Sequence, residues 1–212
     1  PKPFVVRNAD SVSPILLVCD HASRRFPRAL GTMGLDPFAR RCHLALDIGA
    51  GALTEAIADD LSVTAVLCEY SRLIVDCNRQ LMDPGAFLEF GDGMIIPGNR
   101  NLHKEDKERR ADAIYWPYHG AIEAEVERLK GAGVTPLFVS IDSLSQFLIG
   151  ESRTWEMGIL WDLVRSSSIL LVKGLRAAGY LVGDNEPYSG KAPQDFNLDH
   201  HAEPIAMPHV GV

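Results

Sequence analysis

The sequence has no surplus of positive charge and no long apolar run. It carries 21 Lys and Arg against 28 Asp and Glu, a net charge of −7 at pH 7, whereas a nucleic-acid surface requires a basic face. It lacks the run of about 18 apolar residues that a membrane-spanning helix needs, and no signal peptide is visible at its start. We therefore expect no nucleic-acid partner and no membrane partner, although one or two local arginines would suffice for a small anionic ligand.

Cysteine is also scarce. The chain has four cysteines, and no two of them form a Cys-x-x-Cys pair. Cys19, Cys68 and Cys77 lie in or beside apolar runs, as buried, reduced cysteines do. The pattern predicts free thiols and a cytoplasmic protein.

Two groups of enzyme motifs are missing as well. The chain contains no glycine-rich phosphate loop of the dinucleotide or nucleoside-triphosphate kind. It contains no Gly-x-Ser-x-Gly sequence, so a hydrolase built on a nucleophile elbow is not expected. What remains is a set of histidines, carboxylates and arginines near the ends of predicted strands.

The hydrophobic pattern predicts a single α/β domain over residues 1–212, a length sufficient for one well-buried core. Short apolar runs predict strands, and apolar residues at i, i+4 spacing predict helices. Their alternation favours a mixed, mostly parallel sheet with helices on both faces. The predicted strands are 15–19, 64–68, 72–76, 136–141, 157–161 and 181–182, and the predicted helices are 37–61, 104–131 (with a kink or new start at Pro117) and 166–178.

Polar residues follow three of these predicted strands. His21 follows the first, Asn78-Arg79 follows strand 72–76, and Asp142 follows strand 136–141. Sites in open α/β sheets form at the carboxyl ends of strands, so these side chains are expected to line one pocket. The alternative is that the residues flanking His21 only cap a turn and that His21 is a polar loop residue.

Two predicted helices add pairs of ligand-type residues. His43 and Asp47 are four residues apart and so share a helix face, as do His119 and Glu123. Asp47 is a candidate to face the end of strand 15–19. A surface pair is the commoner explanation for a His-x-x-x-Glu spacing, and this alternative stays open beside a metal site.

Zinc would account for such a set of groups. It accepts histidine nitrogen and carboxylate oxygen, and catalytic zinc sites keep an open position for water. The ion lowers the pKa of bound water to about 7 and polarises a carbonyl. Arg72 or Arg79 would neutralise an oxyanion or hold a substrate carboxylate bidentately.

Several sequence blocks resemble the N-formylglutamate amidohydrolase family, in the family's order and over nearly the whole chain. The resemblance implies a central mixed sheet similar to that of the zinc carboxypeptidases and aspartoacylase. It also implies one zinc ion and hydrolysis of an N-acyl amide on an acidic amino acid. The blocks are Cys19–Ser23, Ala45–Ala50, Tyr70–Arg79, Ile96–Arg100, Pro117–His119, Val182–Ser189 and Pro208–His209.

The resemblance also implies roles for single residues. His21 and Asp47 match metal ligands, and Asn78-Arg79 matches the pair with which related carboxypeptidases hold a substrate carboxylate. Arg72 stands where an arginine would stabilise an oxyanion. His119 and Tyr188 are assigned to substrate binding. The residues that fall in family blocks with looser roles are Tyr118, His119, Asn185, Glu186, Tyr188, His201 and His209.

The chain departs from the family pattern at several positions. Asp142 stands where the family normally carries a histidine, and we expect it to be the third zinc ligand. A second carboxylate ligand would make the metal a weaker Lewis acid. Glu156 stands at another position where a histidine is expected, and 162–168 also differs from the usual run.

The general base is a further departure. Family members continue past Val212 into a strand carrying a glutamate that would serve as the base for the zinc-bound water. Either the given sequence stops before that residue, or the residue is missing, in which case Glu186 is the expected catalytic base, with Glu69 as the other candidate.

Three functions are compatible with these observations. The first is zinc-dependent hydrolysis of an N-formyl or other N-acyl amino acid, with N-formylglutamate-like compounds as the expected substrates. The second is a degenerate member that binds a small molecule without metal and without turnover. The third is a hydrolase of the same fold that acts on a peptide or cell-wall amide.

Overall fold

The computed structural model describes residues 2–144, 147–148, 151–152, 154–162, 165–186 and 196–212. Strands and helices alternate along much of this chain, as the hydrophobic pattern predicts. The strands are β1 (Phe4–Arg7), β2 (Ile15–Cys19), β3 (Thr64–Cys68), β4 (Phe90–Gly91), β5 (Met94–Ile95), β6 (Leu137–Ser140), β7 (Phe147–Leu148), β8 (Glu151–Ser152), β9 (Met157–Ile159), β10 (Val182–Asp184) and β11 (His209–Gly211). The helices are α1 (Ala50–Leu61), α2 (Lys104–Arg110), α3 (Trp116–Gly131) and α4 (Ser166–Ala177).

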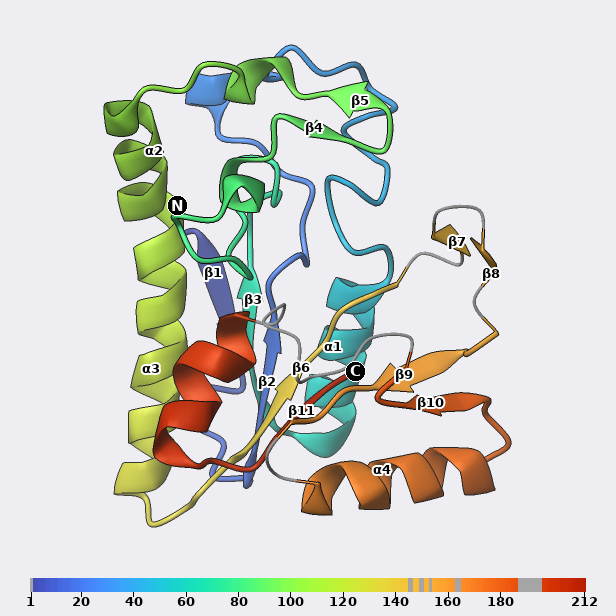
Figure 1. Cartoon of the computed structure of the whole chain (residues 1–212). Coiled ribbons are helices and arrows are strands. Elements are labelled where there is room, and N and C mark those ends of the chain that lie inside the picture. The colour runs from blue at the N-terminus through green and yellow to red at the C-terminus, as the bar shows by residue number, and fades with distance from the viewer. Residues whose placement is uncertain (1, 145–146, 149–150, 153, 163–164, 187–195) are drawn as a thin grey trace.

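A five-stranded sheet in the order β1-β3-β2-β6-β11 forms the centre of the structure (Figure 1). The pairs β3–β2, β2–β6 and β6–β11 are parallel, and β1 pairs with β3 in the antiparallel direction. The prediction of a mixed, mostly parallel α/β sheet is therefore confirmed. The more specific likeness to zinc carboxypeptidases stays a prediction.

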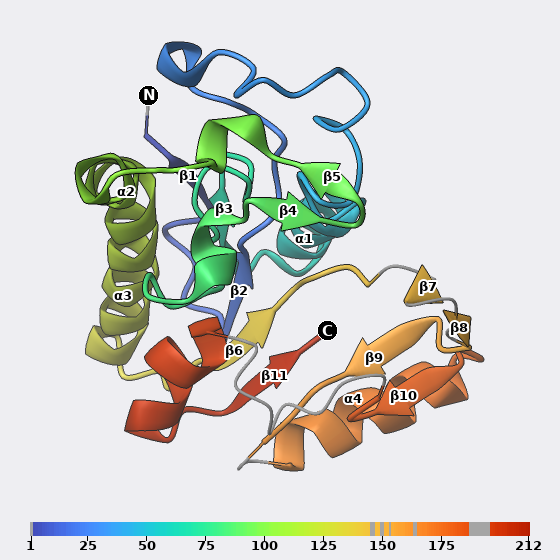
Figure 2. The ribbon, with the colours of Figure 1, turned by 45° about the horizontal axis from the view of Figure 1, so that its top comes forward.

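The central strand β2 is covered on both faces. Alternate side chains of a strand point to opposite sides of the sheet. Leu16 and Val18 accordingly pack in a core cluster with α3, whereas Leu17 and Cys19 pack in another with α1 and α4. Figure 2 shows α3 on one side of the sheet and α1 on the other. Burial on both faces explains why β2 reads as an uninterrupted apolar run.

Only the second half of the predicted helix 37–61 forms. α1 begins at Ala50, directly after Gly49, which has a φ of 90°. The preceding residues form turns, and the backbone N–H of Asp47 donates to the carbonyl of His21 at 3.0 Å. Because a tertiary partner takes this N–H, the helical spacing of apolar residues before Gly49 does not produce a helix.

The predicted strand 72–76 is also wrong. The segment is buried, but it forms turns rather than pairing with the sheet. Side chains satisfy its carbonyls instead. The Asn99 amide donates to the Leu73 carbonyl at 2.8 Å, and the Arg110 guanidinium donates to the Ile74 carbonyl at 3.0 Å. An apolar run can therefore be fully buried without a strand ladder when polar side chains reach its backbone.

The other long predictions are confirmed. The helix over 104–131 forms as α2, a π-helical turn over Ala111–Tyr115, and α3, whose first turn contains Pro117. Pro117 lies just after the π-helical turn, where the regular i→i−4 bonding of the helix is already interrupted. The remaining predicted strands each overlap an observed strand, whereas β1 and the two-residue strands β4, β5, β7 and β8 were not expected.

None of the helices that the structure describes is long and apolar enough to cross a membrane. All four cysteines lie in the described residues and are free. The prediction of free thiols is therefore confirmed.

The start of α1 packs closely against the turn after β2. A Cβ added to Gly51 would lie 2.8 Å from the Ala22 carbonyl oxygen and 3.2 Å from the Ala22 Cα. We expect Gly51→Ala to lower the free energy of unfolding by about 1–3 kcal/mol, the usual cost of overpacking. Urea unfolding measures this change.

Gly120→Ala in α3 is the matched control. A Cβ at Gly120 meets nothing within 4 Å, so this change should stabilise the protein by about 0.5–1 kcal/mol through helix propensity. If both variants gained stability, close packing at Gly51 would not constrain the position of α1.

Candidate metal centre

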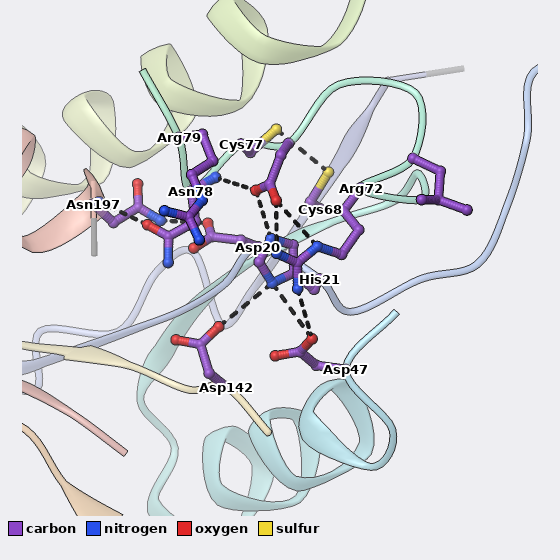
Figure 3. Close-up of polar contacts among 12 residues, drawn as sticks. Asp20, His21, Asp47, Cys68, Arg72, Cys77, Asn78, Arg79, Asp142 and Asn197 are labelled. Carbon is purple, nitrogen blue, oxygen red and sulfur yellow. Dashed lines mark hydrogen bonds and ion pairs between the residues drawn. The ribbon is translucent and has the colours of Figure 1, made fainter. Parts of the chain in front are cut away.

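Three of the predicted site residues converge where β2, β6 and α1 meet. His21 follows β2, Asp142 follows β6, and Asp47 lies just before α1. β2 and β6 are parallel neighbours, so their polar ends lie side by side. His21 Nδ1 is 3.5 Å from Asp47 Oδ1 and 3.6 Å from Asp142 Oδ1. Both carboxylates lie on the same side of the imidazole (Figure 3).

A fourth residue, Asp76, sets the orientation of the His21 ring. His21 Nε2 lies 2.8 Å from Asp76 Oδ1, whereas the buried Nδ1 has no hydrogen-bond partner in the part of the chain that the structure describes. A carboxylate beside one ring nitrogen holds the proton there and leaves a lone pair on the other nitrogen of the neutral ring. Neutral His21 thus presents its Nδ1 lone pair toward Asp47 and Asp142.

Each of these two carboxylates is held through its Oδ2, and its Oδ1 faces His21. Asp47 Oδ2 accepts a hydrogen bond from the Ser143 backbone N–H at 2.9 Å, and Asp142 Oδ2 accepts one from the Ser140 hydroxyl at 3.1 Å. The oxygen nearest to His21 is Oδ1 in both residues. Ligand atoms held in this way are preorganised to bind a cation.

Arg72 joins the centre through Asp76. Its Nε and Nη2 donate to Asp76 Oδ2 at 3.0 and 2.7 Å, and its Nη1 donates to Asp47 Oδ1 at 3.3 Å. Asp76 therefore contacts His21 with one oxygen and Arg72 with the other. His43 and Asp47 were expected to share a helix face, but both precede α1 and are not in a helix. His43 pairs with the exposed Asp92 instead.

The charges in the centre favour an additional positive charge. Burial and Arg72 lower the pKa of His21, but the surrounding carboxylates outweigh both and raise it well above its ordinary value. Burial alone would raise the pKa of Asp76, yet Arg72 and His21 bring it far below its usual range. Three carboxylates face one guanidinium when His21 is neutral. The centre therefore attracts either a proton on His21 or a cation.

The donor set fits zinc or a similar dication. One ligand atom from each of His21, Asp47 and Asp142 lies within 4.8 Å of the other two. Zinc binds imidazole nitrogen and carboxylate oxygen, and three protein ligands leave a position for water. In this arrangement Asp76 is the carboxylate that orients a metal-binding histidine, a partner that such histidines almost always have.

Asn99 and Arg110 hold the segment 72–76 in place through side-chain hydrogen bonds to its backbone. Besides their bonds to its carbonyls, Asn99 donates to the Leu88 carbonyl at 2.8 Å. Arg110 donates to Asn99 Oδ1 at 2.6 Å and to the Gly98 carbonyl at 2.8 Å. Asn99 and Arg110 are buried. These bonds fix the backbone that carries the Arg72 and Asp76 side chains.

Asp20, next to His21, does not serve as a simple turn cap. Its Oδ1 accepts a hydrogen bond from the Asn197 side chain, and the Asn197 backbone N–H donates to Asn78 Oδ1 at 3.1 Å. Burial, followed by the nearby Asp142 charge, raises the pKa of Asp20 to about 7. Asp20 thus ties the end of β2 to a distant part of the chain.

Asn78, which is buried, and Arg79, which is partly exposed, lie beside the centre. Both residues line a cavity of about 390 Å³, and Arg79 also lines a second cavity of about 340 Å³ together with Arg72 and Asp76. The Arg79 side chain is 34% exposed, and its ion pair with Asp83 is long at 3.9 Å. Its guanidinium is therefore accessible to a ligand in either cavity.

His119 lies in a different cluster. Its Nδ1 is 2.8 Å from His201 Nε2, and its ring packs against Tyr115 and Phe196. It is buried and lines neither of the two cavities at Arg79. Its expected partner Glu123 pairs with His200 instead. A role for His119 in substrate binding stays a prediction.

The candidate bases lie outside the converging group. Glu186 is exposed and belongs to neither group of metal-type ligands found among the described residues. Glu69 pairs with Arg25. Glu156 Oε2 accepts a hydrogen bond from the Leu181 backbone N–H at 2.8 Å. Tyr188, predicted to bind substrate, lies outside the described residues.

Asp76 is the main residue of the centre that the sequence reasoning did not assign to the site. It closes an apolar run and directly precedes Cys77-Asn78-Arg79. A carboxylate inside a buried run needs charged or hydrogen-bonding partners, and this is the signal that points to it. Its partners, His21 and Arg72, were both predicted site residues.

The fold and the centre define an α/β protein with a candidate cation site at the carboxyl ends of parallel strands, where such folds carry their ligands. More specifically, the chain belongs to the N-formylglutamate amidohydrolase family, whose sequence profile matches residues 13–211. The family is one of amidohydrolases. Membership confirms the resemblance seen in the sequence blocks.

The solved structures that are similar to this chain include one from Agrobacterium tumefaciens and one from Ralstonia eutropha JMP134. Gene product Atu2144 from Agrobacterium tumefaciens has a TM-score of 0.94 at 31% identity, with 100% of this chain and 84% of that chain covered. N-formylglutamate amidohydrolase from Ralstonia eutropha JMP134 has a TM-score of 0.76 at 19% identity, with the same coverage, and shows the fold alone. A comparison with curated proteins found no match.

Asp76→Asn tests whether Asp76 orients the metal-binding histidine. The change keeps the size of the side chain but removes its charge, so zinc affinity should fall about 10–100-fold, as it does on loss of such a partner. Competition with a chromophoric chelator measures the affinity. Asp92→Asn, which removes an exposed carboxylate, is the control and should bind zinc as the wild type does. Equal zinc affinities for both variants would show that Asp76 does not orient the metal-binding histidine.

Proposed function

We propose that this protein is a zinc-dependent hydrolase of the amide bond in an N-formyl or other N-acyl amino acid, with N-formylglutamate-like compounds as substrates. The observation that carries the proposal is the buried His21 Nδ1, which lacks a hydrogen-bond partner among the described residues and faces Asp47 and Asp142. Membership of the N-formylglutamate amidohydrolase family supports the reaction class.

His21, Asp47 and Asp142 would hold the ion. A bound zinc ion would supply a water of lowered pKa, about 7, and a Lewis acid for the amide carbonyl. Asp76 keeps a proton on His21 Nε2, so that Nδ1 is the nitrogen available for binding. Two carboxylates in the ligand set lower the net charge of the centre, and we therefore expect a weaker Lewis acid than a histidine-richer site would give.

The arginines and Asn78 are proposed to bind and orient the substrate. Arg79 would pair with the substrate carboxylate, since its guanidinium is accessible and its ion pair with Asp83 is long. Asn78 lines the same cavity and would donate from its amide. Arg72 would stabilise the oxyanion through Nη1, because its bond to Asp47 Oδ1 is longer, at 3.3 Å, than the bonds from Nε and Nη2 to Asp76.

The assignments of Glu186 as general base and of His119 and Tyr188 as substrate-binding residues rest on the sequence resemblance. Glu186→Gln tests the first directly. Loss of a general base should lower kcat about 10²–10⁴-fold while zinc content stays unchanged. Glu156→Gln, at a carboxylate bonded to the Leu181 backbone, is the control for kcat. A Glu186→Gln enzyme with wild-type kcat would have its base elsewhere.

The proposed partner is therefore a small N-acyl amino acid. We propose no nucleic-acid partner, because the net charge is −7. A cytoplasmic location is proposed from the four free cysteines, which a reducing compartment maintains.

A degenerate member that binds a small molecule without turnover is the second candidate. The observation that favours it is the network in which Arg72 and His21 already neutralise much of the charge on Asp47 and Asp76. Protein purified without chelator and assayed against a panel of N-formyl and N-acyl amino acids, with and without added zinc, separates the two. Zinc-dependent release of a free amino acid supports the hydrolase, and zinc-free protein without turnover supports the degenerate member.

Arg79→Lys tests recognition of an acidic substrate. A lysine cannot reproduce the two parallel hydrogen bonds of a guanidinium, so KM for an acidic N-acyl amino acid should rise about tenfold with little change in kcat. Steady-state kinetics measures both constants. Arg100→Lys, at an exposed position, is the matched control. An unaltered KM would exclude Arg79 from carboxylate binding.

A further inference from the structure

A second group of metal-type ligands lies between α3 and a π-helical turn over Leu198–Ala202. Figure 1 shows this turn, drawn in red, beside α3. Glu123 in α3 faces His200 in the turn, and His200 Nε2 lies 3.8 Å from Glu123 Oε1. One ligand atom from each of Glu123, His200 and His201 lies within 4.8 Å of the other two.

His201 is held in place by a second histidine. Its Nε2 lies 2.8 Å from His119 Nδ1, and the two rings are stacked with centroids 5.1 Å apart. Burial, and then the neighbouring histidines, lower the pKa of both rings to about 3. When His201 Nε2–H donates the shared hydrogen bond to His119 Nδ1, the remaining lone pair of the neutral His201 ring lies on its Nδ1. A histidine with one ring nitrogen bonded to a fixed partner is the usual arrangement at a metal.

The spacing differs from that of an ordinary surface ion pair. The separation of 3.8 Å between Glu123 and His200 exceeds hydrogen-bond distance. Two ligands at about 2.0–2.2 Å from a tetrahedral zinc ion lie about 3.3–3.6 Å apart, slightly closer than this pair. Glu123 and His200 are exposed and can move by that amount. By contrast, the exposed pair His43–Asp92 is in direct contact and belongs to no three-ligand group among the described residues.

We propose that Glu123, His200 and His201 form a second binding site, for a dication of the zinc type that accepts imidazole nitrogen. Two imidazoles and one carboxylate favour zinc over calcium or magnesium, which take oxygen ligands. The site would link α3 to the turn over 198–202. His119 would act as the positioning residue for His201, which gives a reason for its burial away from the two cavities at Arg79.

Zinc stoichiometry measured by equilibrium dialysis tests this site. The wild type should bind two equivalents. Glu123→Gln and His200→Ala should each weaken one of the two by at least about tenfold and leave the other unchanged. Both residues are exposed, so the variants are expected to fold, and circular dichroism checks this. His43→Ala, which removes an exposed histidine from a pair without a third ligand, should still bind two equivalents.

His21→Ala separates this proposal from the proposed function. This variant should lose the zinc equivalent held by His21, Asp47 and Asp142 and keep the one that depends on His200. A wild type with a single equivalent that is lost only in His21→Ala would overturn the second site and leave the first intact. A single equivalent that is lost only in His200→Ala would support the second site and contradict the zinc centre of the proposed hydrolase. Two equivalents bound by both Glu123→Gln and His200→Ala would also overturn the second site.

Discussion

The contact between Asp76 and His21 is the interaction on which the centre depends. It decides which nitrogen of the imidazole carries the proton and which one faces Asp47 and Asp142. A buried carboxylate is costly unless it is paired and hydrogen-bonded. Asp76 meets this requirement with His21 on one oxygen and Arg72 on the other. The same contacts that stabilise Asp76 therefore orient the candidate metal ligand.

This requirement also explains the unusual backbone of the segment 72–76. In a strand, residues 72 and 76 would share a face but lie about 13 Å apart, whereas Arg72 donates directly to Asp76 Oδ2 at 2.7 Å. The segment turns instead, and its carbonyls are satisfied by Asn99 and Arg110. The segment therefore lacks the backbone hydrogen bonds of a strand, and side chains that lie later in the sequence donate to its carbonyls instead. The contacts that require a turn at residues 72–76 are thus the same contacts that orient His21 in the candidate centre.

The strongest sequence patterns predicted the structure well. The buried strands β2, β3 and β6 follow from short apolar runs, and the meeting of His21 with Asp142 follows from the rule that parallel strands end at one edge. The failures occurred where tertiary hydrogen bonds hold apolar segments in turns rather than in a strand or helix. Residues before Gly49 have helical spacing but form turns, because the Asp47 backbone bonds to His21.

By itself, the sequence determined the class of sheet, the free thiols, and the residue types of the candidate centre, because these depend on local hydrophobic pattern and on chemical identity. The tertiary structure alone decided which residues meet. In the folded chain Asp76 contacts His21, His119 lies in a cluster with His201, and Glu186 lies outside the centre. Such pairings are contacts between segments far apart in the chain, and no local pattern encodes the direction in which a side chain will point.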